Sequence, residues 1–229
     1  MREYILLFCI IFTERLIAQI QPDTVFKHTL HTIQVYKNDN QLDYPIIMLH
    51  SDDYITVRFD EISEKKNLYC YTLEYCDRNW QKSSLQSLQY ISGFEYNDII
   101  SFRLSENTFT DYVHYQFSFP NNDIRILLPG NYLIKVFERE GDKKHLVFQK
   151  RCMVYNPLIH VNGTVKQPTV VEYKKKYQEL SVQLDVKNVR IRDYNTDLTV
   201  KIFQNGRPDK VLADIKPTFV NNSVYEFNS

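Results

Sequence analysis

The amino-acid sequence predicts an all-β protein built from antiparallel β-sandwiches. Aromatic residues make up 14% of the chain, with 17 tyrosines and 14 phenylalanines, whereas alanine occurs only at positions 18 and 213. Aromatic and β-branched side chains pack well on pleated sheets, and a chain so poor in alanine is a weak helix former. Short segments of alternating apolar and polar residues, separated by polar turns, recur along the sequence and favour the same fold class.

The first part of the chain contains a full set of strands for one sandwich. The clearest strand is 112–119, in which Val113 and Tyr115 alternate with polar neighbours. Turn-forming residues such as those at 120–123 separate the strands. In chain order, the predicted strands are 31–36, 45–49, 54–60, 68–76, 99–104, 112–119, 132–138 and 146–155. Together they predict an immunoglobulin- or fibronectin-like sandwich domain over residues 19–156.

The strand predicted at 68–76 leads to the only tryptophan, Trp80. The odd positions of this strand form an aromatic face: Tyr69, Tyr71, Leu73 and Tyr75. One interpretation packs Trp80 in the core against that face. The other leaves Trp80 exposed, where it would stack on a sugar ring or anchor a protein contact. We prefer the core position, and a secreted carbohydrate-binding or protein-interaction module is the alternative.

A second domain is predicted from 157 to 229. Asn156-Pro157 interrupts the strand pattern, because proline disfavours a continuing strand. Further strands are predicted at 159–161, 180–186, 198–204, 211–218 and 224–227, with a type I′ hairpin turn at Asn205-Gly206. A seven-stranded sandwich needs about 100 residues. This segment is shorter, so we expect the second sandwich to be incomplete.

The N-terminus predicts a signal peptide at residues 1–18. Arg2 precedes a short apolar core at 4–12, and Ala18 offers a small residue for cleavage. A buried first strand or helix is the other interpretation. The apolar core is too short to cross a bilayer as a helix, which takes about 20 residues. We therefore expect a mature protein that does not span the membrane.

The charge balance argues against nucleic acid as a partner, and the cysteine positions limit the possible disulfide bonds. Lys and Arg total 28, as do Asp and Glu, so no field of one sign favours nucleic acid. Cys70, Cys76 and Cys152 follow the predicted cleavage site. Cys70 and Cys76 lie too far apart on one extended strand to form a disulfide bond. A link from Cys152 to one of them stays open, beside the preferred interpretation of three buried small side chains.

No catalytic, metal or cofactor motif stands out. The six histidines are dispersed without zinc-ligand spacing, and the sequence has no Cys-x-x-Cys pair, phosphate-binding glycine loop or nucleophile elbow. His114 lies on the polar face of a predicted strand, where a solvent-facing role is the simpler interpretation. We expect a protein that is not an enzyme and that carries no cofactor.

An ordered set of motifs gives the chain a family resemblance. The set consists of Tyr69–Trp80 (Tyr-x-Tyr-x-Leu-x-x-Cys-Asp-x-x-Trp), Ser83–Leu85, Gln89–Phe94, Ser105–Thr108, Tyr112–Asn121, Gly130–Tyr132 and Gln204–Arg207. Each motif is weak alone, but their order resembles that of the plug-protein family of the Bacteroidota type IX secretion system. Members of that family are longer than this chain.

The resemblance implies a function in protein transport. It implies a periplasmic protein, associated with the outer membrane, whose β-sandwich domains bind the outer-membrane translocon barrel of the type IX secretion system. Such a protein plugs the periplasmic opening of the barrel by steric block. The family-motif positions carried over are Asp77, Trp80, Asn107, Tyr115, Asn121 and Asn131. We expect these six residues mainly to hold the fold.

Overall fold

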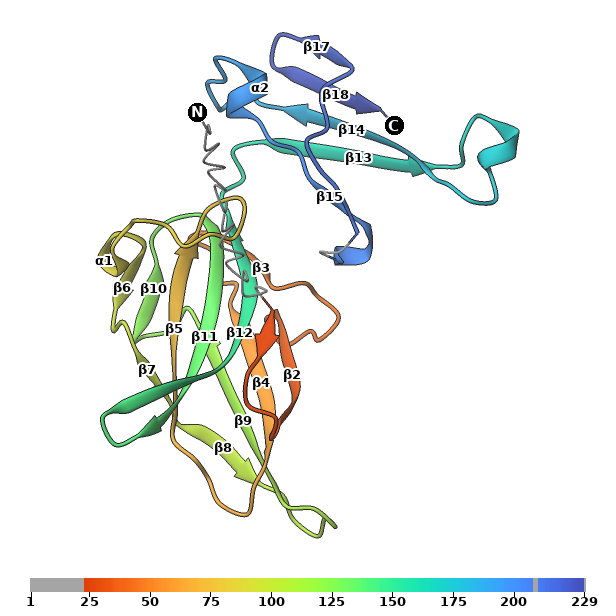
Figure 1. Ribbon diagram of the computed structural model, residues 1–229. Helices are drawn as coiled ribbons and strands as arrows, with labels where there is room; N and C mark the ends of the chain where they lie inside the picture. The colour runs from red at the N-terminus through yellow and green to blue at the C-terminus, as the bar shows by residue number, and fades with distance from the viewer. Residues whose placement is uncertain (1–22, 208–209, 229) are drawn as a thin grey trace, which may run out of the picture.

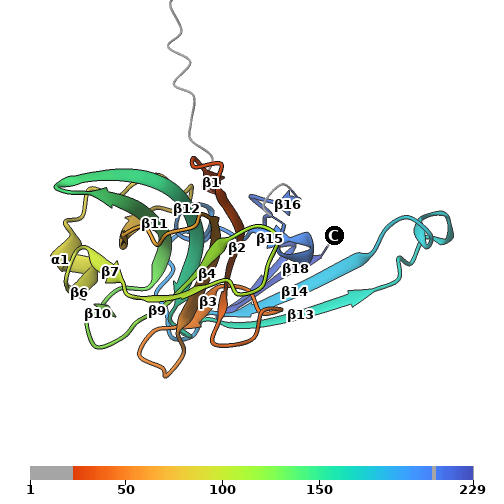
Figure 2. The ribbon, with the colours of Figure 1, turned by 90° about the horizontal axis from the view of Figure 1, so that it is seen from below.

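The computed structural model describes residues 23–207 and 210–228 and shows an all-β protein of packed antiparallel sheets (Figure 1). The predicted signal peptide at 1–18 lies outside the described residues. The chain up to residue 155 forms one large sandwich, and the later strands form a smaller unit beside it. Seen from below, the hairpin of β13 (His160–Lys166) and β14 (Glu179–Asp185) extends away from the large sandwich (Figure 2).

Two main sheets and a small third one make up the first sandwich. The first sheet has the order β1 (Thr24–Val25), β12 (Lys143–Tyr155), β11 (Gly130–Glu140), β5 (Tyr69–Cys76) and β7 (Asn97–Ile99), with β3 (Ile46–Met48) parallel to β12. The second has the order β2 (Leu30–Lys37), β4 (Ile55–Ile62), β9 (Tyr112–Phe119) and β8 (Ser101–Leu104). The third pairs β6 (Ile91–Gly93) with β10 (Ile124–Ile126), beside helix α1 (Ser87–Tyr90).

All eight strands predicted for this part are present, with one rearrangement. The segment 99–104, predicted as one strand, divides at Ile100 between β7 in the first sheet and β8 in the second. The short strands β1, β6 and β10 were not predicted, because two or three residues carry too little alternation to be seen in a sequence.

An aromatic cluster holds the two main sheets together. Phe59 stacks on Tyr115 with 4.9 Å between ring centroids, and Tyr69 meets both rings edge-on. All three side chains are buried. Aromatic pairs at this spacing contribute about 0.5–1.5 kcal/mol each beyond the area that they bury. The odd-numbered face of β5 therefore points into the core, as the alternation predicts.

The even-numbered face of β5 is also covered. Cys70, Thr72 and Cys76 are buried, although they lie on the opposite side from the tyrosines. Cys70, Cys76 and Cys152 are free thiols, so the disulfide left open by the sequence does not form. The preferred interpretation of three buried small side chains is confirmed.

The smaller unit has its own apolar cluster. Its main sheet has the order β13 (His160–Lys166), β14 (Glu179–Asp185), β18 (Val224–Asn228) and β17 (Phe219–Asn221), and a second pair joins β15 (Ile202–Phe203) to β16 (Val211–Leu212). Short helical turns lie at η1 (Val171–Tyr173), α2 (Tyr194–Asp197) and η2 (Gln204–Gly206). The cluster centres on Val182, Leu184 and Phe227.

The strands predicted at 198–204 and 211–218 are much shorter in the structure. Only 202–203 and 211–212 pair with one another. Asn205 and Gly206 both have positive φ, of 53° and 64°, as a type I′ turn requires. The pairing register shows a longer connection than the two-residue turn that was predicted, because Phe203 lies opposite Val211.

Candidate functional site

Asp77 organises a tight turn directly after β5. Its Oδ1 atom accepts hydrogen bonds from the backbone N–H groups of Asn79 at 2.8 Å and Gln81 at 2.9 Å. Its backbone carbonyl accepts from Trp80 N at 3.0 Å and from Asn131 Nδ2 at 2.9 Å. These bonds hold Trp80 at a φ of 64°, a left-handed conformation that costs energy for a bulky side chain. Three of the six family-motif positions thus meet in this turn.

Trp80 lies outside the hydrophobic core, which corrects the preferred interpretation of the sequence. The turn reverses the chain so that Lys82 bridges back to Cys76, and Trp80 is half-buried beyond the end of β5. Trp80 is not part of the hydrophobic core cluster. Tyr90 and Tyr132 pack against Tyr75 instead and fill the end of the sandwich, with ring centroids 5.5 and 5.2 Å from that of Tyr75.

The Trp80 ring packs against a fixed cation. The Arg151 guanidinium carbon lies 5.2 Å from the ring centroid. Asp23 holds Arg151 in place by accepting hydrogen bonds from its backbone N at 2.9 Å and its Nε at 2.7 Å. Arg151 covers one face of the ring, and Trp80 also lines the cleft described in the next paragraph, so part of the ring stays accessible.

The turn after β5 also contacts the smaller unit. Arg78 Nη1 donates to Thr199 Oγ1 at 3.2 Å, and Lys201 Nζ donates to the Arg78 carbonyl at 2.9 Å. A cleft of about 890 Å³ lies beside these contacts. Apolar side chains of both units line much of it, among them Ile33, Val35, Ile46, Val182, Leu184 and Val200.

The other three motif positions lie elsewhere. Tyr115 is buried in the aromatic core, where its hydroxyl accepts from Asn67 N at 2.8 Å. Asn121 closes the turn after β9, since its Oδ1 accepts from Asp123 N at 2.8 Å. Asn107 has a φ of 57° in the exposed β8–β9 loop. The six positions do not converge on one site.

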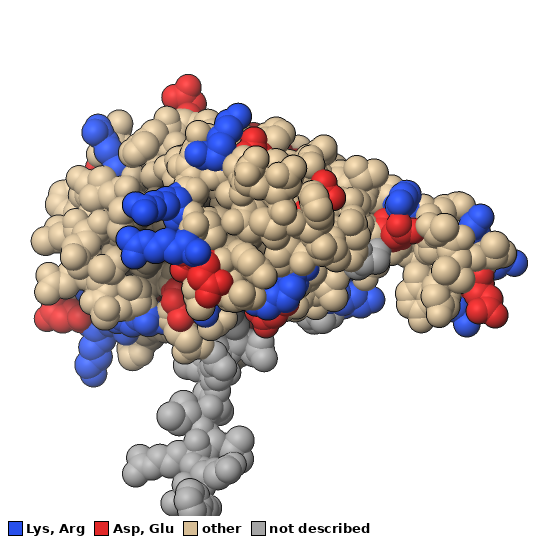
Figure 3. Space-filling view, turned by 90° about the horizontal axis from the view of Figure 1, so that it is seen from above, with Lys and Arg blue, Asp and Glu red and all other residues tan. Residues whose placement is uncertain are grey.

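Charged side chains of both signs share one face of the molecule. Lys and Arg side chains lie among Asp and Glu side chains on the face shown in Figure 3. The full chain carries 28 residues of each sign. A surface of mixed sign does not attract nucleic acid over long distances.

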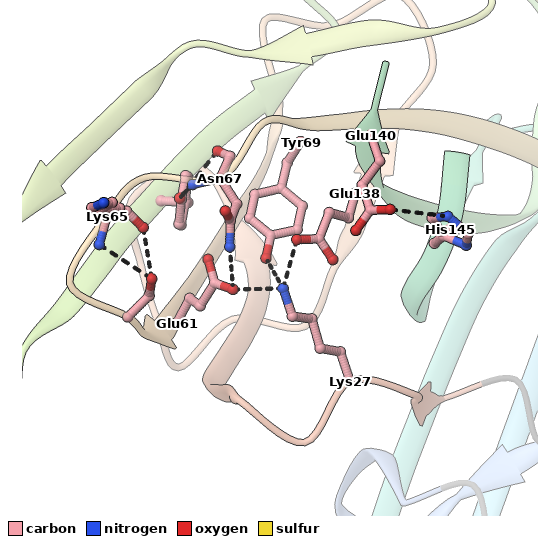
Figure 4. Close-up of polar contacts among 10 residues, drawn as sticks. Lys27, Glu61, Lys65, Asn67, Tyr69, Glu138, Glu140 and His145 are labelled. Atoms are coloured by element: carbon pink, nitrogen blue, oxygen red, sulfur yellow. Dashed lines mark hydrogen bonds and ion pairs between the residues drawn. The ribbon is translucent and has the colours of Figure 1, made fainter. Parts of the chain in front are cut away.

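A partly buried ion cluster, absent from the sequence-based expectations, joins the two main sheets (Figure 4). Lys27 Nζ donates to Glu61 Oε1 at 2.6 Å, to Glu138 Oε1 at 2.8 Å and to the Tyr69 hydroxyl at 3.1 Å. Asn67 Nδ2 also donates to Glu61 Oε1, at 2.9 Å. Glu61 comes from β4 and Glu138 from β11, so one ammonium group bridges the two sheets.

The two carboxylates stabilise the charged form of Lys27. Burial lowers the pKa of Lys27, but hydrogen bonds to Glu138 and Glu61 and their negative charges outweigh burial and raise that pKa above its usual value. The Glu61 side chain is only 1% exposed. Its Oε2 atom has no hydrogen-bond partner among the described residues. The cluster is therefore held together by Lys27.

Part of this cluster could have been found in the sequence. Glu61 continues the apolar face of β4 after Val57 and Phe59, and a carboxylate at a core-facing position needs a buried cation. The cation could not be identified, because Lys27 lies 34 residues from Glu61 and 111 from Glu138.

The described residues show no cluster of side chains for a metal ion. They contain no group of three or more His, Cys, Asp or Glu side chains that could hold a metal ion. His114 Nδ1 lies 2.6 Å from Asp60 Oδ1, and both side chains are partly exposed on the outer face of the second sheet. Within the described part of the chain, no helix is long and apolar enough to cross a membrane.

Comparison with known proteins identifies a family and a similar solved structure. A protein-family model described as "Type 9 secretion system plug protein 1st domain" matches residues 30–156. The chain is also similar to the crystal structure of a hypothetical protein from Parabacteroides merdae ATCC 43184, with a TM-score of 0.84 and 26% sequence identity. That similarity covers 90% of this chain and 51% of the other, so this chain spans about half its length. No curated protein matches.

Proposed function

We propose that this chain, which belongs to the type 9 secretion system plug protein family, binds the periplasmic opening of the outer-membrane translocon barrel and closes it. The single observation that carries the proposal is the family match over residues 30–156, which spans most of the first sandwich. Family membership associates the chain with the secretion system and with the cell envelope. The barrel as direct partner and the periplasm as location are part of the proposal.

A steric mechanism suits the physical character of the first sandwich. A plug must keep its shape against a pore, and the aromatic core and the Lys27 cluster both cross-link the two sheets. The motif residues act in turns and in the core. Asp77 and Asn131 fix one turn, Asn121 fixes another and Tyr115 fills the core. These roles support a binding protein that performs no catalysis.

Direct binding tests the proposal. Purified full chain is mixed with the purified translocon barrel of this secretion system, and with an unrelated outer-membrane barrel as the control. Co-elution on size exclusion with the first barrel and not the second is the expected result. Elution of the chain apart from the translocon barrel, at concentrations well above those in the cell, would remove the basis of the proposal.

A further inference from the structure

One end of the first sandwich exposes a strand edge that has no partner strand in the described structure. β8 pairs with β9, from Ser101 opposite Gln116 to Leu104 opposite Val113, and lies at the end of its sheet. All four β8 residues are exposed. In Figure 1 this edge lies at the end of the molecule opposite the smaller unit. An open edge is a template for a strand from another chain.

The hydrogen-bonding groups at this edge can be assigned. Ser105 N donates to Tyr112 O, so the backbone groups of Ser105 point toward β9. Because these groups alternate along an antiparallel strand, those of Phe102 and Leu104 point away from β9. The same two residues lie opposite Tyr115 and Val113, both buried in the core.

The side chains beside this edge are apolar and only partly covered. Phe102 is 41% exposed and Leu104 is 49% exposed, although both lie on the core-facing side of the sheet. β7, the nearest part of the first sheet in sequence, is only three residues long. The apolar core therefore extends as far as β8, where the side chains of Phe102 and Leu104 are only partly covered by the rest of the protein.

The loop after β8 is held by hydrogen bonds and exposes an aromatic side chain. Thr108 Oγ1 donates to Thr110 O at 3.0 Å and lies 3.1 Å from Ser105 Oγ, and Tyr112 N donates to Ser105 Oγ at 3.0 Å. Phe109 lies between these bonds and is fully exposed. The family motif Ser105–Thr108 thus holds a loop that displays Phe109. An aromatic side chain on a preorganised loop loses little entropy on binding.

We propose that the β8 edge and Phe109 form the docking surface of the plug, and that a strand of the secretion-system partner pairs with β8. The partner strand covers Phe102 and Leu104 with its own apolar side chains, and an apolar pocket of the partner takes the Phe109 ring. This inference rests on the proposed function and names the surface that performs it.

Charge favours a protein partner over a lipid surface. Segments 63–67 and 101–111 carry three basic residues (Lys65, Lys66 and Arg103) and three acidic residues (Glu64, Glu106 and Asp111). Attraction to anionic lipid needs an excess of basic residues, which this surface lacks. Lipid also cannot satisfy the backbone groups of an open strand edge.

Three variants of the full chain test the inference by their affinity for the purified translocon barrel. Phe109→Ala removes the exposed ring, and Leu104→Pro removes an N–H that points away from β9. Phe219→Ala is the matched control, because Phe219 is 55% exposed on β17 in the smaller unit. We expect both docking variants to bind at least tenfold more weakly and Phe219→Ala to bind within twofold of wild type.

Four other results of these measurements would overturn the inference. Wild-type affinity in Phe109→Ala, which loses no packing on folding, would overturn this inference and leave the proposed function intact. No binding by the wild type would overturn both. Self-association of the wild type that Phe109→Ala abolishes would make the edge a dimer contact. Binding to vesicles of anionic phospholipid that the same variant abolishes would make it a membrane anchor; either result would also overturn the inference. Thermal unfolding confirms that Leu104→Pro is folded, and Phe109→Ala decides the outcome if it is not.

Discussion

Lys27 contributes to stability through two carboxylates that come from different sheets. Replacing Lys27 with Met keeps most of the apolar stem and removes the ammonium group, so Glu61 loses its ion pair while it stays buried. Removing one partner of a buried ion pair costs about 3–5 kcal/mol, and the partial exposure of Lys27 reduces this. We expect the free energy of unfolding, measured with urea, to fall by about 3 kcal/mol.

Lys65→Met is the control for this prediction. Lys65 is exposed in the loop after β4. Its replacement is expected to change the free energy of unfolding by less than about 0.5 kcal/mol. Equal losses in the two variants would show that Lys27 does not bridge the sheets.

Because of the buried tyrosines, we expect the free energy of unfolding to fall as the pH rises in the alkaline range. Burial raises the pKa of Tyr71 and of Tyr115 to about 12. An unfolded tyrosine ionises near pH 10, so between about pH 10 and 12 the unfolded chain releases protons that the folded chain keeps. Stability is therefore fully present below about pH 10 and falls above it, by about 1.4 kcal/mol per pH unit for each such tyrosine.

Urea unfolding at about pH 9, 10 and 11 measures this slope. Tyr71→Phe keeps the buried ring and removes one ionising group, so its stability should fall less steeply with pH. Tyr177→Phe, which removes a tyrosine hydroxyl at a position 62% exposed, is the control variant. A wild-type free energy that stays constant to about pH 11 would contradict the prediction.

Residue by residue, the sequence predicts well the side chains that alternate along strands. Tyr69, Tyr71 and Tyr115 are in the core as the period of two requires. Trp80 was placed wrongly because Asp77 reverses the chain there, and a turn held by side-chain hydrogen bonds has no periodic signal.

At the scale of elements, the third sheet depends on one glycine. Gly93 lies opposite Ile124 in the β6–β10 pair with a φ of 114°, and a Cβ atom there would lie 1.9 Å from the Asp123 backbone oxygen. A backbone atom cannot move aside as a side chain can. Gly93→Ala should therefore lower the free energy of unfolding by about 3 kcal/mol, from steric clash and backbone strain together.

Gly141→Ala is the matched comparison. Gly141 also has a positive φ, of 60°, but an added Cβ would meet nothing within 4 Å. Backbone strain alone should cost about 1 kcal/mol. Thermal unfolding of both variants distinguishes the steric clash from the backbone strain. An equal loss of stability in the two variants would show that the clash with Asp123 adds nothing to the strain.

The sequence predicts where the long strands lie more reliably than it predicts which strands pair with one another. β9 alternates between buried and more exposed residues over its whole length, as predicted, whereas β5 is buried on both faces over residues 69–73. The crossing at Ile100 was missed because a strand pattern does not say to which sheet it belongs. Pairings such as β3 with β12, about 100 residues apart in the chain, depend on the tertiary fold alone.

For the whole molecule, the sequence supports an all-β sandwich, and the family resemblance drawn from ordered motifs is confirmed by the family match. The sequence could not show that the six motif positions separate into a turn beside Trp80, a core position and two other loops. It also could not show that Phe109, next to the Ser105–Thr108 motif, is exposed, because Phe109 lies in a loop and not in a strand with alternating side chains.

The central claim is that this chain closes the periplasmic opening of a secretion barrel. The most direct measurement is the ionic current through the translocon barrel in a planar bilayer, before and after full chain is added. The account predicts that current stops when the chain is added on the periplasmic side and continues when it is added on the other side. Undiminished current with the chain bound to the barrel would contradict it.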